Sequence, residues 1–188
     1  MNLILSKLDK DIELKRLIDF DHTLLSYGWN LENKPNCIVF IGASKNNLYF
    51  SFRLETSVKY DQKNNKYDFI EGLWKDDVAE IFIQDANLKS YQEFNFAPSG
   101  AYWTSFFSDY RKQDKEKFKP ILNLEIDSTV FDTSWELAVK IPIDSLSIEF
   151  NFLNFINICS IVHKQKIHYL SMQNLISENP DFHLLKIN

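Results

Sequence analysis

Apolar and polar residues alternate with a period of two along several stretches of this chain. The alternation is clearest in residues 48–55, and it recurs in residues 122–127 and 135–141. Successive side chains of a β-strand point to opposite faces, so each run predicts a strand that buries one face. The predicted core side chains are Leu48, Phe50, Phe52, Phe94, Phe96, Trp135, Leu137 and Val139.

Two further runs, residues 78–84 and 155–162, are apolar on both faces in part and suit the central strands of packed sheets. Short polar segments separate the runs, and no long helical pattern is present. The fold class predicted is therefore all-β, a two-sheet antiparallel β-sandwich. Residues 141–146 predict a strand end followed by one helical turn. Residues 11–20 allow either a short helix or an irregular edge segment.

The length of 188 residues fits one domain spanning residues 1–188, of which residues 1–36 carry the weakest pattern. The net charge is −5, and the run 111–117 mixes both signs and predicts a solvated loop. A chain without a basic cluster is a poor partner for nucleic acid or an anionic membrane. No apolar stretch is long enough for a signal peptide or a membrane span, so we expect a soluble cytoplasmic protein.

Residues 71–111 are the most informative stretch. If residues 91–97 form a strand, Phe94 shares a face with Phe96, and Tyr91, Glu93 and Asn95 share the opposite face. An aromatic hydroxyl, a carboxylate and an amide on one face can hold hydroxyl groups in fixed directions. The turn Pro98-Ser99-Gly100 then leads into a strand that places Tyr102 and Trp103 on opposite faces.

An ordered set of motifs runs through the chain from residue 37 to residue 188. The motifs are Leu73-Trp74, Asp77 with Val78-Ala79-Glu80-Ile81-Phe82, Tyr91-x-Glu93-Phe94-Asn95, Pro98-Ser99-Gly100, Tyr110-Arg111, Trp135 to Pro142, Tyr169, and Pro180-Asp181-Phe182-His183. In this order they resemble the family 9 carbohydrate-binding modules and the small bacterial proteins described as DOMON-like.

The resemblance implies a β-sandwich of jelly-roll (DOMON-like) type that binds a sugar, in characterised modules by stacking the ring between two tryptophans. Trp74 matches the first tryptophan. Residues 169–172 and 177–180 occupy the region of the second and contain no tryptophan. The candidate ligand-binding residues are Trp74, Tyr91, Glu93, Asn95, Trp103, Arg111 and His183. We expect Glu93 to form an ion pair with Arg111 or Arg53, since an unpaired inward charge is costly.

Several alternatives to this ligand site stay open. Trp74 could instead plug the end of the sandwich, and the Glu93–Arg111 pair could be a purely structural brace. A haem-binding DOMON-type domain would need Met172 with one of His163, His168 or His183 as axial ligands. A structural or protein-interaction domain with a vestigial sugar site is the third hypothesis.

No cofactor is expected, although Asp76, Asp77 and Glu80 could supply oxygen ligands to calcium, which some members of the family carry. His163 and His168 would be near one another in a hairpin but lack a third metal ligand. Cys37 and Cys159 lie in apolar runs and are expected to be buried reduced thiols.

No enzyme motif is present. A carboxylate pair such as Glu80 and Glu93 could in principle flank a glycosidic bond, but every acidic protein contains such pairs. We therefore expect a non-catalytic protein.

Overall fold

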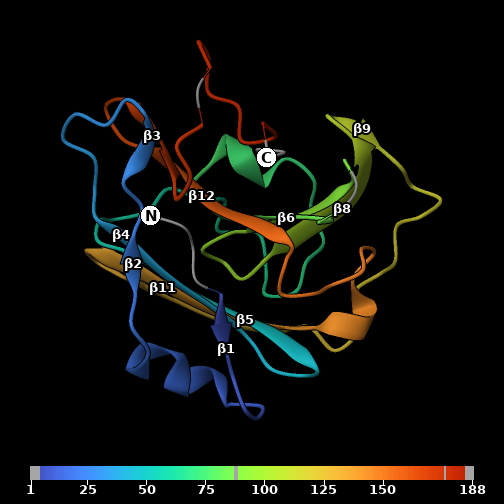
Figure 1. Cartoon of the computed structure of the whole chain (residues 1–188). Helices are drawn as coiled ribbons and strands as arrows, with labels where there is room; N and C mark the ends of the chain where they lie inside the picture. The colour runs from blue at the N-terminus through green and yellow to red at the C-terminus, as the bar shows by residue number, and fades with distance from the viewer. Residues whose placement is uncertain (1–4, 87–88, 176, 185–188) are drawn as a thin grey trace.

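Two β-sheets stack face to face in the computed structural model, which describes residues 5–86, 89–175 and 177–184 (Figure 1). The six-stranded sheet has the order β1 (Ser6–Lys7), β4 (Cys37–Ala43), β5 (Asn47–Leu54), β11 (Ser134–Pro142) and β10 (Glu125–Phe131), with β2 (Thr23–Leu24) also pairing with β4. The seven-stranded sheet has the order β3 (Tyr27–Trp29), β13 (Ile167–Ser171), β12 (Phe155–His163), β6 (Val78–Gln84), β7 (Tyr91–Phe96), β8 (Tyr102–Asp109) and β9 (Lys112–Gln113).

All pairings between neighbouring strands of the two sheets are antiparallel except that of β1 with β4, which is parallel. The helices of the described residues are three short 3-10 helices: η1 (Leu14–Asp19), η2 (Leu73–Lys75) and η3 (Ile143–Ser145). The predicted β-sandwich is confirmed. None of these helices has the length and apolar character needed to cross a membrane.

The core lies between the sheets and is built by the alternation seen in the sequence. All eight predicted core side chains are at most 3% exposed. Phe52 and Trp135 lie on adjacent strands with their ring centroids 4.8 Å apart. The runs 78–84 and 155–162 form the paired central strands β6 and β12, as predicted.

The strand predicted at residues 122–127 is partly wrong. β10 begins only at Glu125, and Leu122 is exposed. Asn123 has a φ of 55°, which breaks an extended chain, and the position that would face it on β11 is Pro142, which has no N–H to donate. The strand pairing therefore cannot extend beyond Glu125.

The N-terminal segment packs on the outer face of the six-stranded sheet. Of the two alternatives for residues 11–20, the short helix is correct, as the 3-10 helix η1, whose Leu17 is buried against Phe40 and Tyr49. Figure 1 shows η1 beneath this sheet and the C-terminal segment above the opposite sheet. Both cysteines are buried free thiols, and η3 follows β11 as predicted.

Candidate functional site

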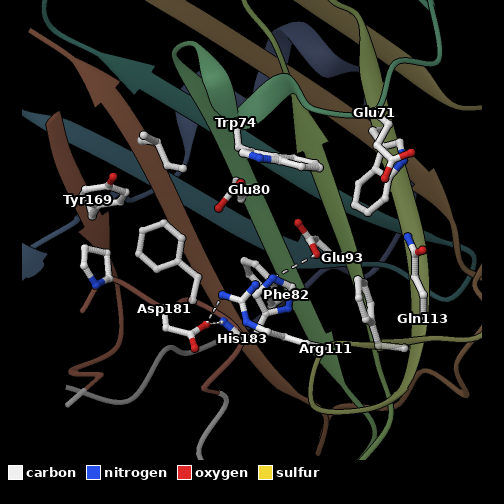
Figure 2. Close-up of a pocket in the computed structure, with 15 residues that line it drawn as sticks. Glu71, Trp74, Glu80, Phe82, Glu93, Arg111, Gln113, Tyr169, Asp181 and His183 are labelled. Atoms are coloured by element: carbon white, nitrogen blue, oxygen red, sulfur yellow. Dashed lines mark hydrogen bonds and ion pairs between the residues drawn. The ribbon is translucent and has the colours of Figure 1, made fainter. Parts of the chain in front are cut away.

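A cleft of about 420 Å³ opens on the outer face of the seven-stranded sheet, under the C-terminal segment (Figure 2). It is lined by Glu71, Trp74, Glu80, Phe82, Glu93, Trp103, Phe107, Arg111, Gln113, Ile161, Tyr169, Pro180, Asp181, Phe182 and His183. Strands β6, β7, β8, β12 and β13 contribute the floor, and the loops that follow or precede them contribute the rim. The cleft therefore combines aromatic walls with several charged groups.

Strand alternation places the floor residues. On β6, Ala79 and Ile81 enter the core between the sheets, so Glu80 and Phe82 point outward into the cleft. The register pairs Glu80 with Asn95 and Phe82 with Glu93. Directly paired residues lie on the same face, so Glu80 and Glu93 are diagonal neighbours on that face, and diagonal neighbours in antiparallel pairs lie roughly 7 Å apart.

Trp74 forms one end of the cleft. It lies on η2, which follows Gly72, and Gly72 has a φ of 91° that favours glycine. Trp74 is 38% exposed, and its ring packs at 70° on Trp103, with the centroids 5.7 Å apart. Trp103 itself is buried and supports Trp74 from below. Trp74 thus combines a contact with a buried ring and a partly exposed surface at the cleft.

Glu93 does not form the ion pair that we expected. Arg53 lies on the other sheet, on the outer side of β5, where it is within 3.5 Å of Glu136, and Arg111 bonds Asp181 at 2.8 Å. Glu93 instead accepts a hydrogen bond of 3.1 Å from the amide of Asn95 and faces His183, whose Nε2 lies 3.8 Å from its Oε2. The prediction was wrong because Asp181, from the C-terminal segment, competes for Arg111.

A hydrogen-bonded chain links Arg111 to His183 through Tyr91. The backbone N–H of Arg111 donates to the Tyr91 hydroxyl at 3.1 Å, and that hydroxyl lies 2.7 Å from Nδ1 of His183. A hydroxyl has one proton, which here is free to be donated to Nδ1. This arrangement assigns the imidazole proton to Nε2, on the side of Glu93.

Asp181 holds the C-terminal segment over the cleft. It accepts hydrogen bonds from the guanidinium of Arg111 and the hydroxyl of Tyr110, and from the backbone N–H of His183. Burial opposes ionisation of Asp181, but the hydrogen bonds from Tyr110 and Arg111 outweigh it and hold the pKa of Asp181 below its ordinary value. Asp181 is therefore an anion that anchors the rim.

The pKa values of the two glutamates in the floor are shifted upward, in the opposite direction to that of Asp181. Burial raises the pKa of Glu80 well above its ordinary value, and the neighbouring charge of Glu93 raises it further. Burial likewise raises the pKa of Glu93 to about 7, against the hydrogen bond from Asn95 and the charge of Arg111. Burial and the charge of Arg111 lower the pKa of His183 to about 4, so this imidazole is neutral at pH 7.

The structure brings together most of the sequence-predicted ligand residues. Trp74, Glu93, Trp103, Arg111 and His183 all line the cleft. Tyr91 and Asn95 lie behind it and position the lining residues. Trp135 is a core residue with no exposed surface, as expected.

Several lining residues were not predicted. From the sequence, Glu80 was expected only as a calcium ligand or as one half of a carboxylate pair. Phe82, Asp181 and Phe182 belong to the motifs that carry the resemblance, but they were not among the predicted ligand-binding residues. The period of β6 puts Glu80 and Phe82 on one face, but no sequence signal fixes which strands lie beside that face.

The three acidic residues that could bind calcium do not lie in one site. Asp77 is buried and accepts the backbone N–H groups of Lys59 and His163, whereas Glu80 lies in the cleft. Within residues 5–86, 89–175 and 177–184, no group of three His, Cys, Asp or Glu side chains could hold a metal ion. Asp76, Asp77 and Glu80, which could have supplied oxygen ligands to calcium, therefore do not form a metal site in the described residues.

The histidines are also separated. The register pairs His168 with Val162, a core residue, so His168 points to the opposite face from His163. Met172 is buried in the core between the sheets, whereas His183 lines the cleft outside them. These two side chains lie on different faces of one sheet and cannot be axial ligands of one haem.

No protein-family model and no curated protein matches the chain. Solved structures do. A protein of Bacteroides uniformis that is provisionally described as carbohydrate-binding superposes with a TM-score of 0.74 at 15% sequence identity, over 98% of this chain and 94% of that one. A family 9 carbohydrate-binding module of Caldicellulosiruptor kristjanssonii in complex with glucose gives a TM-score of 0.63 at 9% identity, over 92% and 85% of the two chains.

The chain has the fold of a family 9 carbohydrate-binding module. The Caldicellulosiruptor module in complex with cellotriose agrees, with a TM-score of 0.61 at 7% identity over 90% of this chain and 83% of that one. The family 9 fold is thus retained although few residues are identical.

Proposed function

We propose that this chain is a non-catalytic carbohydrate-binding module and that a sugar ring binds in the cleft beside Trp74. The observation that carries the proposal is the half-exposed indole next to a floor of hydrogen-bonding groups. The neighbours of similar fold support it: one is described as carbohydrate-binding, and two are complexes with glucose and cellotriose.

The chemistry of a sugar matches both parts of the cleft. A pyranose ring presents an apolar face of C–H groups, which packs on an aromatic ring, and hydroxyl groups that need directional partners. Trp74 supplies the aromatic ring, while Glu93 and Glu80 supply acceptors and Arg111 a donor. The volume of about 420 Å³ lies within the range of about 300–1,000 Å³ that is typical of small-molecule sites.

The second wall of the cleft differs from a tryptophan clamp. Among residues 169–172 and 177–180, Tyr169 is the aromatic residue, and it lines the cleft apart from Trp74 (Figure 2). We therefore propose a one-sided stack on Trp74, with Tyr169 as a weaker lateral contact. With one aromatic platform, the dissociation constant should be of millimolar order, which corresponds to about 4 kcal/mol.

The placement of the two glutamates supports a non-catalytic role. Glycoside hydrolysis requires two carboxyl groups that flank the scissile bond on either side. Glu80 and Glu93 project from neighbouring strands on the same sheet face. Both would therefore meet a bound sugar from the same side.

The test is a titration of the protein with glucose, cellobiose and cellotriose, followed by NMR chemical shifts or calorimetry. We expect millimolar binding with shifts in the indole N–H of Trp74, and loss of binding in Trp74→Ala. Phe131→Ala is the matched control, because Phe131 is also half-exposed but lies on β10 outside the cleft. If Phe131→Ala and Trp74→Ala lose binding equally, or if no sugar binds, the proposal is wrong.

A further inference from the structure

Glu80 is a buried carboxyl group for which the described residues provide no hydrogen-bond or ion-pair partner. The residue is 3% exposed, and it makes no hydrogen bond or ion pair with any described part of the chain. Figure 2 shows its carboxyl group in the middle of the cleft, close to Trp74. Buried carboxyl groups in proteins are normally paired, because an isolated one is costly to remove from water.

The neighbours of Glu80 across the sheet offer it no positive charge. Asn95 faces it from β7, and the amide N–H₂ of Asn95 is used by Glu93, while Asn95 Oδ1 is a buried acceptor without a partner. Cys159 faces Glu80 from β12, and its thiol lies against Asn157 and Ser171. The nearest charged neighbour on this face is therefore a second carboxyl group, that of Glu93.

The positive charge of Arg111 is balanced at the rim by Asp181. The guanidinium of Arg111 forms an ion pair with Asp181 at 2.8 Å. His183 accepts a hydrogen bond from the Tyr91 hydroxyl, and it is neutral at pH 7 because burial lowers its pKa to about 4. Glu71 adds another carboxyl group to the lining. The centre of the cleft thus holds more carboxyl groups than basic groups, under an aromatic wall.

We propose that the ligand of this cleft carries a positively charged amino group, as an amino sugar does, and that Glu80 and Glu93 bind that group. An ammonium has three N–H donors and no acceptor, so it complements a floor made of acceptors. Hydrogen bonds between charged groups are about twice as strong as neutral ones. The rings of Trp74 and Trp103 add a cation–π surface. The inference rests on the proposed function, because it names the class of sugar that the cleft takes.

A divalent metal ion is the competing occupant, and the structure favours the amine. No three described His, Cys, Asp or Glu side chains are arranged around a common point. Two carboxyl groups beside aromatic rings provide too few oxygens for calcium, which takes about 6–8. They suffice for one ammonium group.

Binding of an ammonium should release a proton. The ionisable groups that line the cleft with Glu80 are Glu71, Glu93, Arg111, Tyr169, Asp181 and His183, and Cys159 is its register partner on β12. Among them, Glu80 and Glu93 repel each other when both are charged, so near pH 7 the pair retains a proton that a cation between them would displace. A neutral sugar would leave that proton in place.

The experiment is isothermal titration calorimetry at pH 7 with glucosamine, glucose, N-acetylglucosamine and cyclohexylamine. These probes separate the amino group from the sugar ring. We expect glucosamine to bind at least tenfold more tightly than glucose or N-acetylglucosamine. The binding enthalpy of glucosamine should also depend on the ionisation enthalpy of the buffer, because binding releases a proton. Glu80→Gln should reduce glucosamine affinity at least tenfold and glucose affinity by a clearly smaller factor, because the amide oxygen of Gln still accepts a hydrogen bond from a hydroxyl but carries no charge for the ammonium. Glu136→Gln, on the other sheet, is the matched control and should change neither.

Each contrary outcome identifies which proposal fails. If glucose binds as tightly as glucosamine and both depend on Trp74, the sugar site stands and the amine inference is overturned. If cyclohexylamine binds through Glu80 but no sugar does, sugar binding is overturned. If calcium binds in the cleft, and if Glu80→Gln no longer reduces glucosamine affinity when calcium is present, the acidic pair is a metal site and the amine inference fails.

Discussion

The hydroxyl of Tyr91 lies 2.7 Å from Nδ1 of His183, although the two residues are 92 positions apart. Tyr91 is on a central strand of the seven-stranded sheet, and His183 comes from the C-terminal segment that covers it. The same hydroxyl accepts the backbone N–H of Arg111. One phenol group therefore joins the sheet, the β8–β9 turn and the C-terminal segment at the rim of the cleft.

Replacement of Tyr91 by Phe should destabilise the protein by about 1–3 kcal/mol, because the buried Nδ1 of His183 loses its partner. The phenyl ring itself stays stacked on Phe107, whose centroid lies 4.7 Å away. Urea denaturation measures the change. Tyr67→Phe is the control, because its hydroxyl is half-exposed and 3.4 Å from the N–H of Ile126, and it should change the free energy of unfolding by less than about 0.5 kcal/mol. Equal effects of the two variants would contradict the proposed linkage.

Truncation of two tryptophans of this chain should lower the free energy of unfolding by clearly different amounts. Trp135→Ala removes a core ring with no exposed surface and should cost about 3–5 kcal/mol. Trp74→Ala removes a ring that is 38% exposed and should cost much less, about 1 kcal/mol. Thermal or urea unfolding provides the comparison. A loss of folding in Trp74→Ala would show that Trp74 plugs the sandwich rather than forming a platform.

The stability of the protein should respond to pH through Glu93. Its pKa is raised from 4.5 to about 7, so between these pH values the native state holds a proton that the unfolded chain has released. The free energy of unfolding therefore falls as pH rises through this window. His183 acts in the opposite direction between about pH 4 and 6.5, because its native pKa is lowered.

Glu93→Gln removes the titration of Glu93 and its effect on the pKa of Glu80, whereas His183 is common to both proteins. Relative to this variant, the wild type should lose up to roughly 3 kcal/mol between pH 4.5 and 7. Urea denaturation at pH 4.5, 6 and 8 measures the difference. A difference that is constant across the three pH values would mean that Glu93 is ionised in the native state throughout.

Arg111 combines an ion pair with an unfavourable backbone conformation. Its φ is 51°, in the left-handed region that glycine adopts without steric cost. Arg111→Ala and Arg111→Gly both lose the bond to Asp181, but only Gly relieves the backbone, so the Gly variant should be more stable by roughly 0.5–1 kcal/mol. At Lys112, in strand β9, the order should be reversed, with Ala more stable than Gly. The same order at both positions would show that the backbone of Arg111 carries no strain.

The strands and their buried faces were predictable because alternation is a local property. The faces of β5, β7 and β11 follow directly from the sequence, and the predicted core residues are buried. The first residue of β10 was not predictable, because it depends on Asn123 and on Pro142 of the neighbouring strand. The partner of Arg111 was also missed, because Asp181 is 70 residues away and reaches it only through the path of the C-terminal segment.

Local alternation dictates which side chains share a face of each strand, including Tyr91, Glu93 and Asn95 on β7, because successive residues of an extended chain point in opposite directions. The position of Glu80 beside Glu93, and of His183 at the cleft that they line, depends instead on how the strands and the C-terminal segment pack in the folded protein. Strand register and the course of a terminal segment are set by the total burial of the folded protein, and no single stretch of sequence contains that information.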